Sequence, residues 1–201
     1  MNNKNTYAWV FLLIAFIFNN PVYAHNLTVT TKDGKCIATI GGEKLECVLG
    51  RNGISRDKHE GDGTTPAGEF PLREIFIRID RIDEASFPKT TGLKINKLTP
   101  EDGWCDDPND INYNKYVNLS HFDPQISHED LYRNDHLYDI FIVVGYNDDP
   151  VIAGKGSAIF IHVASPTYSP TAGCVAFAES DLLKILKKLT KDSRLIVLSP
   201  K

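Results

Sequence analysis

The sequence lacks an excess of positive charge. Its 201 residues include 22 lysines and arginines against 26 aspartates and glutamates, which gives a formal net charge of −4. Proteins that bind nucleic acid through phosphate contacts normally show a basic excess, so the composition predicts no nucleic-acid partner. A hydrophobic fraction of 42% with nearly balanced charge also excludes a disordered chain. The composition is that of an ordinary globular protein.

A hydrophobic run long enough to cross a bilayer is also lacking. The longest run, residues 8–18 (AWVFLLIAFIF), has 11 residues, whereas a membrane span needs roughly 20. It follows Lys4 and precedes a small residue, Ala24, an order typical of a secretory signal peptide. The alternative, an uncleaved membrane anchor, is disfavoured by the length of the run. We therefore expect cleavage after Ala24, no stable membrane anchor afterwards, and a mature chain, 25–201, that folds as one domain.

Cysteines are few, and in a secreted protein they can form disulfides because the compartment is oxidising. There are four: Cys36, Cys47, Cys105 and Cys174. The segments KCIATI and EKLECV flank a Gly-Gly pair and predict a hairpin in which Cys36 lies opposite Cys47, at a Cα separation that suits a disulfide. A Cys47–Cys105 bond is the alternative, and it would leave Cys36 unpaired. Under either pairing we expect Cys174 to keep a free thiol.

Short β-branched and aromatic runs, separated by turn residues, dominate the mature chain. One segment, ESDLLKILKKL, breaks this pattern because its apolar residues recur at helical spacing, and Ser180 is the expected N-cap of the helix. The middle of the chain, 82–133, is polar and turn-rich and is expected to be a long irregular insertion between two halves. The predicted fold class is mainly β with a few helices. Strands are predicted at 27–31, 36–40, 44–49, 69–78, 139–146, 158–164, 174–177 and 194–199.

Residues with nucleophilic and basic side chains gather near the C-terminus. His162 ends an apolar strand, and Thr171-Ala172-Gly173-Cys174 opens the next apolar run. An imidazole close to a thiol can hold it as the reactive thiolate. Gly173 permits a tight turn, so the amides of Gly173 and Cys174 could face a developing oxyanion. The pattern predicts a cysteine acyl-transfer site, and the alternative is a buried structural cysteine with an unrelated histidine.

At these residues the sequence resembles the L,D-transpeptidase family, the YkuD-type catalytic domain of bacterial cell-wall enzymes. The family's signature is a strand histidine followed by Ser or Thr and then Gly-Cys, which His162, Thr171, Gly173 and Cys174 match. A second block, GTTPAGEF at 63–70, is similar to the family's Thr-Pro-x-Gly-x-Phe turn. The resemblance covers about 27–199. It implies a YkuD-like β-sandwich of mixed sheets, and the expected signal peptide predicts a periplasmic location for the mature chain.

The resemblance also implies a mechanism. Cys174 would attack a carbonyl of a peptidoglycan stem peptide, with His162 as general base and then general acid, to give a thioacyl-enzyme. The amine of a neighbouring stem would then accept the acyl group, so stem peptides are both donor and acceptor. No metal, ATP or other cofactor is implied, because the bond energy passes from the old amide to the new one. The backbone carbonyl of Val163 or Ala164 would orient the imidazole. If water replaces the amine, the same site is an L,D-carboxypeptidase.

The sequence departs from the family pattern at two positions. Ala172 stands where many members have His, and Ala176 where Arg or Asn is common, and the gap from His162 to Cys174 is shorter than usual. The lost polar groups leave substrate preference open and motivate a second interpretation, a non-catalytic cell-wall binding module. The segments GRNGISRDKHEGDGTTPAGEF, DGWCDDP and GYNDDP are more similar to a distinct proteobacterial branch. That similarity keeps open a cross-link between the first and third residues of stem peptides.

Further charged and aromatic side chains are candidates for substrate binding. The planar guanidinium group of arginine can form two parallel hydrogen bonds to a carboxylate. For each candidate named below, the alternative to substrate binding is a solvated surface position. No metal site is predicted, because the histidines at 121, 128 and 136 and the aspartate pairs at 106–107 and 148–149 fit no familiar ligand spacing. The candidates for contact with substrate carboxylates are Arg51, Arg56, His59, Trp104 and Arg133.

Overall fold

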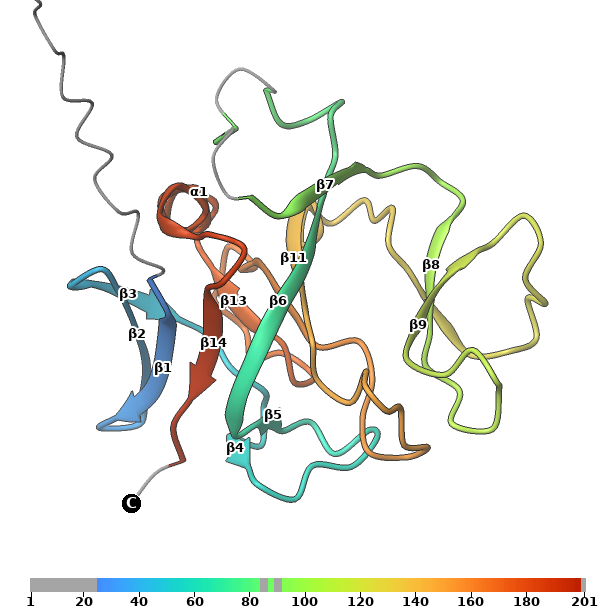
Figure 1. Cartoon of the computed structure of the whole chain (residues 1–201), viewed down its shortest axis with the longest axis horizontal. Helices are drawn as coiled ribbons and strands as arrows, with labels where there is room; N and C mark the ends of the chain where they lie inside the picture. The colour runs from blue at the N-terminus through green and yellow to red at the C-terminus, as the bar shows by residue number, and fades with distance from the viewer. Residues whose placement is uncertain (1–24, 84–86, 89–91, 200–201) are drawn as a thin grey trace, which may run out of the picture.

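The computed structural model describes residues 25–83, 87–88 and 92–199, and a nine-stranded sheet forms its body (Figure 1). The expected signal peptide, 1–24, lies outside the described residues. The strands of this sheet are β1 (Leu27–Lys32), β2 (Lys35–Ile40), β3 (Glu43–Cys47), β6 (Gly68–Ile77), β7 (Lys94–Lys97), β11 (Ile140–Val144), β12 (Phe160–Val163), β13 (Val175–Phe177) and β14 (Arg194–Val197). All eight predicted strands are present, with ends shifted by at most two residues.

The sheet is mixed, as the resemblance implied. Its main path runs β13-β12-β11-β6-β14-β1-β2-β3, and β7 pairs with β6 at a branch. The pairs β1 with β14, β12 with β13 and β6 with β7 are parallel, and the other pairs are antiparallel. The prediction of a mainly β fold with mixed sheets is confirmed.

The two ends of this path meet, so the sheet almost closes on itself. Val48, directly after β3, exchanges two backbone hydrogen bonds with Ala176 of β13, at 2.8 and 2.9 Å. The chain then continues alongside the next turn, where the Thr171 amide donates to the Leu49 carbonyl and the Arg51 amide donates to the Thr171 carbonyl, both at 2.9 Å. Segment 48–51 is therefore fixed beside the turn that precedes β13.

The central strands are buried on both faces, which explains why their sequences read as continuous apolar runs. On β11, Ile140 and Ile142 enter the main core, while Phe141 and Val143 point to the opposite face. The same alternation places Ile161 in the main core and Phe160 on the opposite face. That opposite face carries a second core, made of Phe76, Leu98, Trp104, Leu131, Tyr138, Phe141, Val143, Ala158, Phe160 and Cys174.

The predicted helix is present as α1 (Glu179–Lys188), and it is the one helix in the part of the chain that the structure describes. Its residues Leu182, Ile185 and Leu186 are buried in the main core. The expected cap is wrong: the N-cap is Ala178 and forms no side-chain hydrogen bond, so Ser180 lies inside the first turn. In place of a side-chain cap, acidic residues in the first turn, one of them Glu179, stabilise the N-terminus of the helix by interacting with the positive end of its dipole. No helix among the described residues has the length and apolar character needed to span a membrane.

In the sequence, segment 82–133 separates the strands of the two halves of the main sheet, and it contains more β structure than expected. It contains β7 and a separate three-stranded sheet in the order β10-β8-β9, formed by β10 (His128–Asp130), β8 (Asp102–Cys105) and β9 (Lys115–Asn118). Strands of three or four residues are too short for an apolar alternation to show in the sequence. This small sheet lies to the right in Figure 1 and contributes Trp104 to the second core. A further short pair joins β4 (Ile54–Ser55) to β5 (Thr65–Pro66).

Candidate active site

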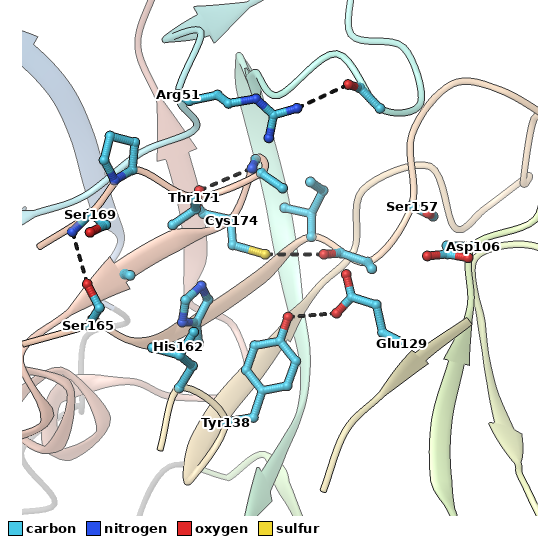
Figure 2. A pocket seen from close by; sticks show the side chains of 18 of the residues that line it. Arg51, Asp106, Glu129, Tyr138, Ser157, His162, Ser165, Ser169, Thr171 and Cys174 are labelled. Atoms are coloured by element: carbon cyan, nitrogen blue, oxygen red, sulfur yellow. Dashed lines mark hydrogen bonds between the residues drawn. The ribbon is translucent and has the colours of Figure 1, made fainter. Parts of the chain in front are cut away.

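A pocket of about 440 Å³ lies over the second-core face, where β12 and β13 begin (Figure 2). Segments from three distant parts of the chain form its walls, and the motif of His162, Thr171, Gly173 and Cys174 lies among them, whereas no residue of the Thr-Pro block at 63–70 does. The lining residues are Arg51, Lys58, Glu60, Gly61, Asp106, Glu129, Arg133, Leu137, Tyr138, Ser157, Ala158, Ile159, His162, Ser165, Ser169, Pro170, Thr171, Ala172, Gly173, Cys174 and Ala176.

Cys174 lines the pocket with a thiol held by backbone groups. The thiol donates a hydrogen bond to the Ala158 carbonyl at 3.2 Å and accepts one from the Phe160 amide at 3.3 Å. The residue is 8% exposed, so its sulfur lies at the floor of the pocket. The hydroxyl of Thr171 fixes the turn before it, because it donates to the Cys174 carbonyl at 2.7 Å and accepts from the Gly173 amide at 3.1 Å.

Gly173 is required by two features of that turn. Its φ of +150° is a conformation that residues with a Cβ rarely adopt, and an added Cβ would lie 2.8 Å from the Thr64 carbonyl oxygen. Thr64 belongs to the Thr-Pro block, so the two predicted motifs are in contact. One expectation is not met: the Gly173 amide donates to Thr171, and is therefore not aimed at a developing oxyanion.

His162 lies on β12, opposite Ala176 of β13. Cys174 precedes Ala176 by two residues, so it faces the same side of the sheet, diagonally from the imidazole. The ring nitrogen Nδ1 lies 2.8 Å from the Val163 carbonyl oxygen. Because a carbonyl only accepts, Nδ1 carries the proton and Nε2 is left as the basic nitrogen. Of the two carbonyls suggested by the resemblance, that of Val163 is the one used.

The resting pair is neutral, contrary to the expected thiolate and imidazolium. Burial lowers the pKa of His162 to about 4. Burial, together with the negative charge of Glu129, raises the pKa of the Cys174 thiol to about 12. An ion pair is disfavoured because this side of the sheet is covered by apolar side chains and both charged forms would lose hydration.

A hydrogen-bonded pair, the buried Tyr138 and the partly buried Glu129, lies across the pocket from the thiol. The Tyr138 hydroxyl donates to Glu129 Oε2 at 2.7 Å (Figure 2). Burial raises the pKa of Glu129, and it raises the pKa of Tyr138 well above its usual value. The ring of Tyr138 also packs edge-on against His162, with a centroid separation of 5.3 Å. Tyr138 therefore connects the carboxylate to the imidazole.

Charges of both signs line the pocket. Three carboxylates, those of Glu60, Asp106 and Glu129, accompany three cations, those of Arg51, Lys58 and Arg133. Glu60 accepts a hydrogen bond from Ser157 at 2.7 Å. The guanidinium of Arg133 lies 5.1 Å from the centre of the Tyr138 ring and is paired with Asp135. Such a pocket suits a ligand that is itself charged with both signs.

The predicted substrate-binding residues divide into two groups. Arg51 and Arg133 line the pocket, as expected. Trp104 does not, since it is buried beneath the pocket, donates to Asn114 at 3.1 Å and packs edge-on against Phe160.

Two further candidates also fall outside the pocket lining. The ring of His59 is exposed and lies 3.8 Å from Asp57. Arg56 donates to the Ser199 hydroxyl at 3.1 Å. Lys58, next to His59 in the chain, lines the pocket instead, with 4% of its side chain exposed.

Several lining residues were missed by the sequence reasoning. Lys58 and Glu60 lie within the DKHEG segment, next to His59, so the signal was adjacent to the residue that was chosen. Glu129 and Tyr138 had no signal, since Glu129 falls in the supposed irregular insertion and Tyr138 precedes a predicted strand. Only the small sheet, which carries Glu129 on β10, brings it to the pocket.

No group of three or more His, Cys, Asp or Glu side chains within the described ranges is placed to hold a metal ion. Two of the loop histidines have other partners: Nδ1 of His128 lies 2.7 Å from the Ile126 carbonyl, and Nδ1 of His136 lies 2.7 Å from Asp139.

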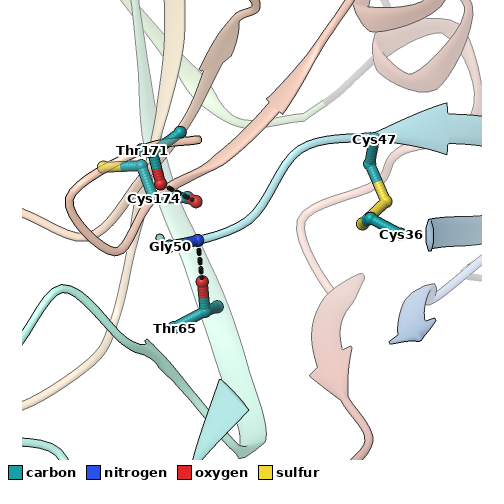
Figure 3. Close-up of a disulfide and its surroundings, with 6 residues drawn as sticks. All are labelled: Cys36, Cys47, Gly50, Thr65, Thr171 and Cys174. Atoms are coloured by element: carbon teal, nitrogen blue, oxygen red, sulfur yellow. Dashed lines mark hydrogen bonds between the residues drawn. A yellow bond between two sulfur atoms is a disulfide. The ribbon is translucent and has the colours of Figure 1, made fainter. Parts of the chain in front are cut away.

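The cysteines near the site are in two states. Cys36 and Cys47 lie opposite each other in the predicted register of β2 and β3 and form a disulfide, with Cα atoms 5.0 Å apart (Figure 3). Cys105 and Cys174 are free and buried, so the alternative Cys47–Cys105 bond is absent. The disulfide lies just before segment 48–51, in which the Gly50 amide donates to the Thr65 hydroxyl at 2.9 Å.

Comparison with known proteins agrees with this geometry. Residues 21–197 match the model of the L,D-transpeptidase catalytic domain, YkuD, so the chain belongs to this family. The family acts on peptides of peptidoglycan, which relates the protein to the cell wall. No curated protein and no solved structure gives a significant match.

Proposed function

We propose that the protein is an L,D-transpeptidase that cross-links peptidoglycan stem peptides through a thioacyl-enzyme on Cys174. One observation carries the proposal: a free thiol lies on the floor of the pocket, on the same side of the sheet as an imidazole whose Nε2 is unprotonated. A nucleophile and a base facing one cavity are the minimum requirement for acyl transfer.

The neutral resting pair determines how the first step runs. As sulfur attacks the carbonyl carbon, the thiol proton leaves Ala158 and passes to Nε2 of His162, so no isolated thiolate is needed. The imidazolium then protonates the departing amine, and a thioester remains on Cys174. In the second half of the reaction, an incoming amine transfers its proton to His162 and attacks the thioester, which restores the thiol.

The charges of the pocket support a stem peptide as substrate. Such peptides carry carboxylates, which Arg51 and Arg133 would bind, and amino groups, which the carboxylates of Glu60, Asp106 and Glu129 would bind. The same pocket admits an amine or water to the thioester. A cross-link between first and third residues would therefore use the same catalytic residues with different stem peptides. The L,D-carboxypeptidase reaction would use the same residues with water as the acceptor.

We further propose that the protein acts in the periplasm after removal of residues 1–24. Two features support this: the order of charged, apolar and small residues before His25, and the Cys36–Cys47 disulfide, a bond typical of oxidising compartments.

Product analysis tests the proposed function. The mature protein, 25–201, is incubated with muropeptides that carry tetrapeptide stems, and the products are identified by mass spectrometry. Dimers with a new amide bond are expected, and their masses identify donor and acceptor. Stems shortened by one residue would instead identify a carboxypeptidase. Binding of intact muropeptides without any turnover would identify a binding module and contradict the proposal.

A further inference from the structure

We propose that Lys58 is a further catalytic residue, whose ammonium group stabilises the oxyanion formed during attack by Cys174. This inference rests on the proposed function and assigns a role that neither sequence motif predicts. Lys58 lines the pocket, yet only 4% of its side chain is exposed. A lysine buried to that extent loses much of its hydration, so its charge must be balanced by an acidic side chain or by a negatively charged ligand.

The backbone around Lys58 is shaped to admit its side chain. An added Cβ on Gly156 would lie 2.9 Å from Cε of Lys58, and an added Cβ on Gly173 would lie 3.3 Å from its Nζ. Glycine thus stands at two positions where the lysine side chain lies close to the backbone. The second contact places the ammonium beside the residue directly before Cys174.

Asp62 holds the ammonium in this position. Nζ of Lys58 donates to Asp62 Oδ1 at 2.9 Å and lies 3.5 Å from the His59 carbonyl. Although partial burial acts in the opposite direction, the hydrogen bonds from the amides of His59 and Thr64 and from Lys58 hold the pKa of Asp62 well below its usual range. A third ammonium proton has no acceptor among the described residues, and it is available to a ligand in the pocket.

An ammonium group at this position would replace the Gly173 amide, one of the two amides expected to face the oxyanion. The Gly173 amide is already bonded to Thr171, so it is not available to bind the oxyanion. When sulfur bonds to the carbonyl carbon, the π electron pair moves onto oxygen and the thiol proton goes to His162. When that pair returns, the C–N bond breaks and the amine takes the proton from His162. The negative charge exists only between these steps, so a fixed cation beside Gly173 lowers the barrier to both.

The experiment compares Lys58→Met with wild type and with Lys184→Met, which removes an exposed lysine from the ion pair with Asp181 on α1. Steady-state kinetics on the stem-peptide substrate and thermal unfolding are measured for each. We expect Lys58→Met to lower kcat about 100-fold with little change in KM, since loss of one oxyanion donor typically costs about 10²–10³. Lys184→Met should match wild type.

A second variant, Lys58→Gln, covers the case in which Lys58→Met does not fold. Its amide can still bond Asp62 but carries no charge, so we expect a fall in kcat of about tenfold or more. A folded variant at position 58 with kcat within threefold of wild type overturns the inference and leaves Lys58 as a structural partner of Asp62. Failure of the wild-type protein to turn over would instead contradict the proposed function itself, so the two failures are distinguishable.

Discussion

The thiol of Cys174 donates its hydrogen bond to the carbonyl oxygen of Ala158, 3.2 Å away, and not to His162. Ala158 has a φ of +50°, which is uncommon for a residue with a Cβ, and its amide is bonded to Asn114 Oδ1 at 3.1 Å. This backbone conformation directs the carbonyl at the sulfur. The thiol is therefore kept protonated at rest, and in the proposed reaction it would pass its proton to His162 only as a substrate is attacked.

The negative charge of Glu129 contributes to that protonated state. Replacement Glu129→Gln keeps an acceptor for the Tyr138 hydroxyl but removes a charge that disfavours the thiolate, so the pKa of Cys174 should fall. A fall of one unit raises the thiolate fraction about tenfold at a fixed pH below the pKa, so alkylation should be several-fold faster. The rate of iodoacetamide modification at Cys174, followed by intact mass, measures this. Glu179→Gln on the exposed end of α1 is the matched control, and equal rates in both variants would contradict the role of Glu129.

Burial of His162 predicts an unusual titration. The neutral imidazole is favoured in the folded protein, with a pKa of about 4, so the base is present above that pH and lost as the pH falls through it. We expect kcat/KM to have no acid limb near pH 6.5, the ordinary histidine value. Titration of the His162 ring signals by NMR measures the pKa of the imidazole directly and so distinguishes it from the titration of carboxylates on the substrate. A midpoint near 6.5 would show that the ring is hydrated and the neutral pair is wrong.

Thr171 is expected to act by fixing the turn. Thr171→Val keeps the shape but leaves the Gly173 amide and the Cys174 carbonyl without their hydroxyl partner. We expect a loss of roughly 1–3 kcal/mol in the free energy of unfolding, because a polar group left unpaired on folding costs about this much. Denaturant unfolding measures it. Thr171→Ser retains the hydroxyl and should recover most of the stability; if serine and valine behave alike, the hydroxyl bonds have no part in it.

Arg51 tests whether the cations of the pocket bind substrate. Its side chain is exposed and forms one long hydrogen bond, 3.5 Å to the Gly61 carbonyl, so its removal should leave the fold unchanged. Arg51→Ala is expected to raise KM several-fold with kcat within about twofold, the pattern of a lost ground-state contact. The control is Arg56→Ala in the same loop, which bonds Ser199 instead. An unchanged KM in Arg51→Ala would exclude the contact.

Local patterns in the sequence predicted most strands of the main sheet, and the motif near the C-terminus predicted Cys174 and His162, which both line the pocket. Alternation and apolar runs predicted eight of the nine strands of the main sheet, all but β7, and the hairpin register placed Cys36 opposite Cys47. Features that depend on contacts between distant segments were not predictable. Glu129 reaches the pocket only through a sheet of three- and four-residue strands, and Trp104, a candidate for substrate contact, is buried and packs edge-on against Phe160. The protonation states also required the fold, because they follow from burial and not from residue type.

The most direct test of the account is the intact mass of the protein after brief exposure to a tetrapeptide-stem muropeptide, with peptide mapping of any adduct. We predict an acyl group on Cys174, released on addition of an acceptor amine, and no adduct and no cross-linked product with Cys174→Ala. If Cys174→Ala forms the same products as wild type, or if the acyl group maps to another residue, the proposed nucleophile is wrong.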